Sequence, residues 1–269
     1  MRPDNNSETS MRTPCFIANW KMNKTLGEAE EYLRVLEKRW PQLPPSPWEA
    51  IIAPPFTLLA SMATSLKGSP LRIGLAAQNL FFEERGAFTG EISPLMLRDA
   101  GCRYVIIGHS ERRTYFGETN ALVHKKIGAA LRAGLIPILC VGETREEREA
   151  ERTWEVIERQ LKEALDDLRP GPSDWLIAYE PVWAIGTGLT PQPDEAEAVH
   201  RQIRNFFRSL FEETGADTPR ILYGGSVTEK NIAAFMKKDD IDGVLAGGAS
   251  LSADSFCNMI ALGVQAKAK

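Results

Sequence analysis

The chain has 269 residues, of which 43% are hydrophobic and 25% charged, a composition typical of a globular protein with a sizeable core. A net charge of -4 gives no general attraction to nucleic acid or to an anionic membrane, and no stretch is long and apolar enough to span a membrane. Four cysteines without a CxxC motif indicate buried free thiols, as expected in a reducing, cytoplasmic compartment.

Residues 1–13 are polar and lack the apolar segment of a signal peptide. We expect a disordered tail there, with Met11 as an alternative start to Met1. No linker rich in Ser, Pro or Gly interrupts the rest of the chain, which predicts a single domain over residues 14–269.

Short apolar runs then alternate with longer amphipathic ones, the pattern of βα repetition. The apolar runs predict eight strands, at residues 16–18, 50–53, 71–77, 104–107, 136–141, 175–179, 221–223 and 243–246. Between them, apolar residues recur at spacings of three and four, which predicts amphipathic helices. The clearest sets are Ala29, Leu33, Leu36 and Trp40; Trp154, Ile157, Leu161 and Leu165; and Val199, Ile203, Phe206 and Leu210.

Strands that are apolar throughout are buried on both faces, and eight βα units predict a single closed (β/α)8 barrel, the TIM-barrel fold of the α/β class. An open, doubly wound sheet is the alternative. Such a sheet normally carries a glycine-rich dinucleotide turn after an early strand, but the nearest match, residues 186–191, comes late and has Pro191 where the third glycine belongs. No P-loop motif occurs in the sequence.

Polar and small residues follow the predicted strands, at the end where such barrels carry their chemistry. In chain order they are Asn19, Lys21, Gln78, Asn79, His109, Glu111, Glu143, Glu180, Ser226, Gly247 and Gly248. Because the carboxyl ends of parallel strands face the same way, we expect these residues to converge on one mouth. A carboxylate, an imidazole and an ammonium beside glycine turns suit proton transfer next to the carbonyl group of a phosphorylated substrate.

Glycine pairs close the seventh and eighth strands, at Gly224-Gly225 and Gly247-Gly248, and the second pair precedes a predicted helix start at residues 252–254. Backbone N–H groups of such turns can hold a phosphate dianion, and barrels that bind phosphate do so after these two strands. Tight turns alone are the alternative explanation of the glycines.

Glu180 directly follows the sixth strand and is the candidate base, by elimination among the carboxylates. Glu111 is better placed to orient Lys21, and Glu143 is either structural or catalytic. A helix beginning after His109 would favour a neutral ring that donates to a carbonyl oxygen, although a lone histidine is more often structural. Lys21 in the same mouth would compete with a cation, so we expect no metal.

Residues 181–191 predict a lid over the site. An enediolate with a phosphate on the next carbon eliminates that phosphate unless the site closes around it. Pro181-Val182-Trp183 is a stiff beginning, and N–H groups of Gly186-Thr187-Gly188 would reach the phosphate. The alternative is a fixed loop that packs its own Trp183.

Six segments together resemble the triosephosphate isomerase family: NWKMN at 19–23, IGHSERR at 107–113, CVGE at 140–143, YEPVWAIGTG at 179–188, YGGSV at 223–227 and GGASL at 247–251. They stand in the family's order, and the resemblance runs from Cys15 to near the C-terminus. It implies interconversion of dihydroxyacetone phosphate and D-glyceraldehyde 3-phosphate through an enediolate, without a cofactor.

The resemblance also assigns roles. Glu180 would carry the proton between carbons, and His109 would be the neutral electrophile at the carbonyl oxygen. Asn19 and Lys21 match the family's substrate-binding pair. The residues that match the family's phosphate site are Gly186, Ser226, Gly247 and Gly248.

Residues 78–91 resemble the family's interface loop, which implies a homodimer with Thr89 reaching the partner subunit. Phe81, Phe82 and Phe88 in this segment suit an apolar contact patch, or else cover the chain's own core. Three features depart from the family pattern. The N-terminal tail is longer, Leu189 stands where a lysine is frequent, and Asn120 stands where an acidic residue is common.

Two other functions stay open at this level. Lys21 is a candidate for Schiff-base formation with a ketose phosphate, which would make the chain an aldolase. A barrel can also persist as a non-catalytic binding or scaffold protein, since fold does not determine function. In that case Lys21 would be an ordinary surface lysine.

Overall fold

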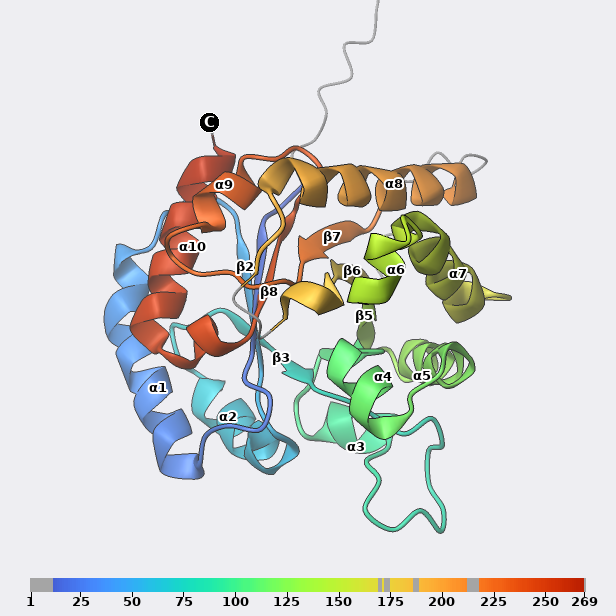
Figure 1. Cartoon of the computed structure of the whole chain (residues 1–269). Coiled ribbons are helices and arrows are strands. Elements are labelled where there is room, and N and C mark those ends of the chain that lie inside the picture. Colours follow the sequence, from blue (N-terminus) through green and yellow to red (C-terminus); the bar gives the residue numbers. More distant parts are fainter. Residues whose placement is uncertain (1–11, 169–170, 172–174, 186–188, 212–217, 269) are drawn as a thin grey trace, which may run out of the picture.

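Eight strands close into one barrel that is surrounded by helices (Figure 1). The computed structural model describes residues 12–168, 171, 175–185, 189–211 and 218–268. Most of the predicted tail therefore lies outside the described residues. Of the tail residues inside them, Arg12 forms an ion pair with Asp242, with 2.6 Å between Nε and Oδ1.

All neighbouring strands are parallel and follow chain order around the barrel. The register aligns Ile17 of β1 with Ile51 of β2 and with Leu245 of β8. This closure confirms the (β/α)8 barrel, and the alternative open sheet is wrong because the first and last strands pair with each other. The strands are β1 (Cys15–Asn19), β2 (Glu49–Ala53), β3 (Ile73–Ala77), β4 (Tyr104–Ile107), β5 (Ile136–Val141), β6 (Leu176–Tyr179), β7 (Arg220–Tyr223) and β8 (Gly243–Ala246).

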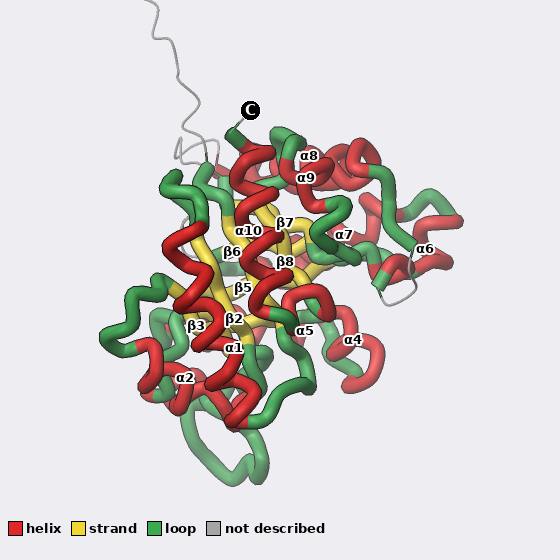
Figure 2. The backbone as a smooth tube through the Cα atoms, turned by 90° about the vertical axis from the view of Figure 1, so that its left-hand side faces the viewer, coloured by secondary structure: helices red, strands yellow, loops and turns green. Residues whose placement is uncertain are grey.

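Helices follow the strands and cover the barrel, and α1 and α10 lie side by side on its outside (Figure 2). The three amphipathic patterns fall in α1, α7 and α8, except that α1 ends before Trp40 because Pro41 cannot continue it. The helices are α1 (Leu26–Arg39), α2 (Leu59–Leu66), α3 (Pro94–Asp99), α4 (Ser110–Phe116), α5 (Asn120–Arg132), α6 (Arg145–Glu149), α7 (Thr153–Leu165), α8 (Pro193–Phe211), α9 (Ile232–Met236) and α10 (Ala253–Lys267).

Single 3-10 turns complete the helical elements: η1 (Trp40–Gln42), η2 (Phe56–Leu58), η3 (Val182–Ala184) and η5 (Gly248–Leu251). Within the described ranges, none of the helices has the length and apolar character needed to cross a membrane. The four cysteines are free and buried, as predicted.

Side chains alternate along each strand between the inside of the barrel and the layer beneath the helices. Ile17, Ile106, Ala178 and Leu245 belong to the inner cluster, whereas their strand neighbours pack outward against the helices. The alternation has a direct consequence at the mouth. Two residues beyond Ala178, Glu180 must again face inward, at the carboxyl end of β6.

The segment between β3 and α3 projects away from the barrel in both views (Figure 1 and Figure 2). Phe81 contacts Phe82 and Phe88, with ring centroids 4.4 and 4.6 Å apart. Phe82 also packs on the outer core, whereas Phe88 is 44% exposed. The three aromatic rings therefore give the projecting loop an internal anchor and leave an apolar side chain in solvent.

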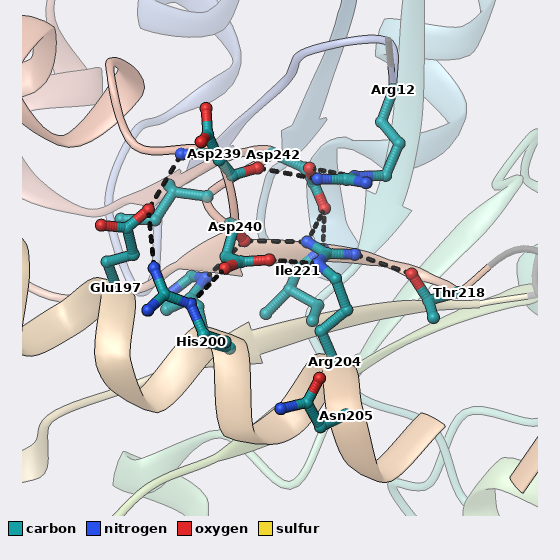
Figure 3. A network of polar contacts seen from close by, with 12 residues as sticks. Arg12, Glu197, His200, Arg204, Asn205, Thr218, Ile221, Asp239, Asp240 and Asp242 are labelled. Atoms are coloured by element: carbon teal, nitrogen blue, oxygen red, sulfur yellow. Dashed lines mark hydrogen bonds and ion pairs between the residues drawn. The ribbon is translucent and has the colours of Figure 1, made fainter. Parts of the chain in front are cut away.

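A buried ion network ties α8 to the beginnings of β7 and β8 (Figure 3). Arg204 is fully buried and donates to the carboxylates of Asp240 and Asp242, each at 2.7 Å, and to the hydroxyl of Thr218 at 2.7 Å. Asp242 also accepts from the backbone N–H of Ile221 at 2.8 Å. Asp242 also pairs with Arg12, so that removing Arg204 would leave this buried carboxylate with one cationic partner instead of two.

His200 lies in the same region, fully buried, with Nδ1 3.3 Å from the carbonyl oxygen of Asp240 (Figure 3). Burial lowers the pKa of His200 from 6.5 to about 4, and the nearby Asp242 carboxylate only partly opposes this effect. In the unfolded chain the ring takes up a proton near pH 6.5, so the neutral ring favours the folded state above that pH.

We predict that this contribution, about 3 kcal/mol, is lost as the pH falls from 6.5 towards 4. Urea unfolding of the wild type and of His200→Gln, at pH 7 and at pH 4, measures it. The wild type should lose about 3 kcal/mol more than the variant between the two pH values, because glutamine does not titrate. An equal loss in both proteins would contradict the assignment.

Candidate active site

The predicted residues converge at the carboxyl ends of the strands. Asn19 is the last residue of β1, and Glu180 follows the last residue of β6. Both are buried, and in each case the residue two positions earlier faces the inside of the barrel. His109 and Glu111 come from the end of β4 and the first turn of α4. Strand parity and parallel closure are thus sufficient to bring three segments of distant sequence to one place.

Glu180 is a buried carboxylate with 1% of its surface exposed. Its Oε2 accepts a 2.9 Å hydrogen bond from the backbone N–H of Ser110, and its Oε1 lies 2.9 Å from Nε2 of His109. Burial raises the pKa of Glu180, but His109, the Ser110 N–H and the ammonium of Lys21 together hold it below its ordinary value. The group is therefore ionised at neutral pH, which is the form a base requires.

His109 occupies the N-cap position of α4. Its Nδ1 accepts a 3.2 Å hydrogen bond from the backbone N–H of Glu111, so in the neutral ring the proton resides on Nε2, facing Glu180. Burial lowers the pKa of His109, while the carboxylates of Glu180 and Glu111 together raise it above its ordinary value. The charge of the ring therefore depends on where the Glu180 carboxylate lies.

Lys21 is held in a left-handed backbone conformation, with φ of 53°. Its N–H donates to Oδ1 of Asn19 at 3.1 Å, its carbonyl accepts from Gln78 at 2.8 Å, and its Nζ lies 2.6 Å from Oε1 of Glu111. Such a conformation is unfavourable for a side chain larger than glycine and persists where surrounding contacts fix it. The predicted pairing of Lys21 with Glu111 is present.

A cavity of about 270 Å³ opens beside these groups. Its lining includes Lys21, His109, Ser226, Gly247 and Gly248, five of the predicted site residues. A Cβ on Gly247 would lie 3.3 Å from Cε of Lys21, so a larger residue would crowd the ammonium there. The predicted Gly186 lies outside the described residues.

The η5 turn begins at Gly248, and α10 follows after its N-cap Ser252, so the predicted helix start is found. Gly247, Gly248 and Ala249 line the cavity, and Lys21 lies beside Gly247. A lysine next to a glycine turn suits a small dianion such as a phosphate, because backbone N–H groups of such turns can bind anions.

The first part of the predicted lid is anchored in this structure. Nε1 of Trp183 donates to Oε1 of Glu143 at 2.9 Å, and Tyr179 donates to the same oxygen at 3.1 Å. The Ser226 hydroxyl donates to the carbonyl oxygen of Ala184 at 3.0 Å. Glu143, which the sequence left as either structural or catalytic, holds the beginning of the predicted lid through these contacts. Residues 186–188 of the predicted lid lie outside the described residues.

The sequence did not identify the Ser110 N–H or Gly142 as contributors to the site, and it identified Gly224 only as part of a possible phosphate-binding turn. The Ser110 N–H is a backbone group and carries no side-chain signal. Gly142 and Gly224 make room for Glu180: a Cβ on Gly142 would lie 1.7 Å from the carbonyl oxygen of Glu180, and a Cβ on Gly224 would lie 2.9 Å from Cγ of Glu180. A glycine in a sequence does not state which side chain it accommodates.

Other chemistries have less support at this mouth. Among the residues that the structure describes, His, Cys, Asp and Glu side chains form no group of three or more that could hold a metal ion. Cys140 lies near Glu180 at the end of β5, but burial raises the pKa of its thiol, which therefore stays protonated and is a poor nucleophile.

A barrel with a buried carboxylate, an adjacent imidazole and an ammonium beside a glycine-lined cavity has the equipment of the enzymes that move a proton next to the carbonyl group of an anionic substrate. The comparisons with known proteins narrow this class. The family model for triosephosphate isomerase matches residues 14–263, and the chain belongs to that family.

Curated relatives support the assignment over nearly the whole chain. Triosephosphate isomerase of Endomicrobium trichonymphae is 52% identical over 251 residues, which cover 93% of this chain and 98% of the relative. That of Aquifex aeolicus is 51% identical and covers 91% of this chain and 97% of its own length. The crystal structure of triosephosphate isomerase from Bartonella henselae superposes with a TM-score of 0.83 at 40% identity, covering 93% of this chain and 98% of that one.

We predict that Gly142→Ala displaces the backbone at Glu180 and lowers kcat at least tenfold, an order-of-magnitude expectation for a base moved by about 1 Å. Steady-state kinetics measures the effect. Gly27→Ala in α1 is the matched control, because an added Cβ there meets nothing within 4 Å. A Gly142→Ala enzyme as active as the control would contradict the packing argument.

Proposed function

We propose that the chain is an isomerase that interconverts dihydroxyacetone phosphate and D-glyceraldehyde 3-phosphate by moving one proton between neighbouring carbons. The observation that carries the proposal is the ionised, buried Glu180 within 2.9 Å of Nε2 of His109, beside a cavity with a cation. Membership of the triosephosphate isomerase family supports the same reaction and the same triose phosphate substrate.

Residues that line the cavity are assigned to binding of the substrate's phosphate group. The phosphate would occupy the N–H groups at Gly247 and Gly248, with Ser226 alongside, and Lys21 would offset its charge. The Ser226 hydroxyl has to break its hydrogen bond with the carbonyl oxygen of Ala184 before it can donate to the phosphate. Phosphate binding is thereby coupled to the lid. Gly186 is proposed as a further phosphate ligand from its match to the family pattern.

The chemical step follows from the contacts of Glu180. The carboxylate leaves the Ser110 N–H, removes a proton from the carbon next to the carbonyl group, and returns it to the neighbouring carbon. Nε2 of His109 donates to the carbonyl oxygen, where negative charge develops, and passes its proton to that oxygen. The ring then takes up the hydroxyl proton of the neighbouring carbon, so that the two oxygens also exchange their roles. When Glu180 moves onto the substrate, the charge that raises the pKa of His109 moves with it, which favours the neutral ring predicted from the sequence.

This cycle is balanced by the protein alone, since Glu180 removes and returns one carbon-bound proton while one hydroxyl proton moves from one substrate oxygen to the other. We therefore propose that no cofactor takes part. A lid over residues 181–191 would close on the phosphate and exclude water during the lifetime of the enediolate. Leu189 is 44% exposed in this loop, and we assign no direction to its effect on closure.

The alternatives are less well supported. An aldolase needs the lone pair of a free amine, whereas Lys21 is an ammonium in a 2.6 Å ion pair with Glu111. A scaffold protein would have no need to keep a charged carboxylate buried beside a histidine, an arrangement that costs desolvation energy.

We further propose a homodimer formed through the loop over residues 78–91, with Thr89 reaching the partner's site. Exposed apolar side chains flank the mouth and support this contact: Met22 is 95% exposed, Tyr115 76% and Phe116 67%. We also propose a catalytic domain over residues 14–269 after the tail over residues 1–13, and a cytoplasmic location, for which the four buried free thiols are the support.

We predict that Glu180→Ala and Glu180→Gln lower kcat by roughly two to four orders of magnitude with little change in KM, because they remove the base and keep the phosphate site. A coupled assay with D-glyceraldehyde 3-phosphate measures both constants. Glu30→Gln, an exposed carboxylate of α1, is the control. Near-normal turnover in either Glu180 variant would remove the base assignment.

For the dimer, we expect the wild type to sediment as two subunits and Thr89→Arg to sediment as one, with reduced kcat, because a bulky cation at the loop tip blocks docking. Analytical ultracentrifugation combined with kinetics measures both. Thr64→Arg, on the exposed face of α2, should behave as the wild type. A monomeric wild type, or a Thr89→Arg dimer, would count against the proposed interface.

A further inference from the structure

A second cavity, of about 560 Å³, lies at the opposite end of the barrel from the proposed active site. Its lining includes Glu49 and Ile73, the first residues of β2 and β3, and Arg103, which precedes β4. Glu180, in contrast, follows the last residue of β6. Because all strands are parallel, a ligand in this groove would not touch the catalytic groups.

Three cationic side chains line this groove: Lys67 at the end of α2, Arg72 before β3, and Arg103. Within the part of the chain that the structure describes, none of the three has a carboxylate within 4 Å, although the arginines Arg12, Arg204 and Arg220 do. Three like charges repel one another unless an anion lies between them. Their gathering in a chain of net charge -4 therefore points to an anionic ligand.

Among the described residues that line the groove, Glu49 is the one carboxylate, and it does not cancel these charges. Glu49 is paired with Arg220, with 2.7 Å between Oε2 and Nη2, and its other oxygen accepts the hydroxyl of Tyr104. Its negative charge is thus already paired with the guanidinium of Arg220. The groove keeps an excess of positive charge at the surface.

The shape and the remaining lining indicate the kind of anion. Leu66, Leu71 and Ile73 form an apolar wall, and the volume exceeds what a single phosphate would fill. Cavities of a few hundred Å³ with apolar walls and a few charged groups are typical of sites for organic ligands. Two guanidinium groups suit phosphate oxygens, because each presents paired N–H donors.

We propose that this groove binds an organic polyphosphate of nucleotide size. Lys67, Arg72 and Arg103 hold the phosphate groups, and the apolar wall formed by Leu66 and Leu71 packs against the base. The site is separate from the isomerase site, so its occupancy is independent of the proposed catalytic step.

Isothermal titration calorimetry with ATP tests the proposal, using the Glu180→Ala protein saturated with dihydroxyacetone phosphate so that the catalytic phosphate site is filled. We expect one ATP per chain, and binding at least about tenfold weaker for AMP, which has a single phosphate. The double variant Arg72→Glu with Arg103→Glu should also weaken ATP binding at least about tenfold, as like-charge contacts replace attraction.

Two controls make the outcome decisive. Arg132→Glu with Arg208→Glu changes the net charge equally on α5 and α8, away from the groove, and should bind ATP as the parent does. The groove variant, made in the active enzyme, should keep wild-type isomerase activity, which verifies its fold; Lys67→Gln serves as a second variant.

Absence of ATP binding would overturn the proposal. Equal binding by the groove variant and the parent would overturn it as well, as would binding that is lost when dihydroxyacetone phosphate fills the catalytic site. Because the readout is binding, failure here leaves the proposed isomerase activity untouched.

Discussion

The contact between the carboxylate of Glu180 and the ring of His109 is the constraint on which the rest of the active site depends. Burial raises the pKa of Glu180 and so favours the protonated form, which cannot act as a base. The group stays ionised because α4 supplies His109 and the Ser110 N–H. Since α4 follows β4 and Glu180 follows β6, the register of both strands against β5 sets this distance.

The proposed active site lies at one end of the barrel, and the buried ion network lies at the other. At the mouth, Gly142 and Gly224 leave space for Glu180, and Lys21 adopts an unfavourable backbone conformation beside Glu111. At the other end, Arg204 joins α8 to β8 through fully paired buried charges. The conformation of Lys21 is fixed by its contacts with Asn19, Gln78 and Glu111.

Much of this organisation could be predicted from the sequence. Continuous apolar runs located all eight strands, and the residue after each run located Glu180, His109 and Lys21 at one mouth. The contacts that hold them were not predictable, because they join a backbone N–H to a side chain 70 residues away, or link Arg12 to Asp242 across 230 residues. The role of Glu143 needed the position of Trp183, and the cationic groove needed the spatial neighbours of Arg72 and Arg103.

Proton transfer through Glu180 is tested most directly by the fate of substrate hydrogen. Dihydroxyacetone phosphate labelled with deuterium at the carbon that is deprotonated is converted in ordinary water, with the aldehyde product trapped and examined by mass spectrometry. A carboxylic acid exchanges its proton with water, so we predict that part of the transferred label is lost to solvent. Complete retention of that label, at normal turnover, would indicate direct hydride transfer and contradict the account.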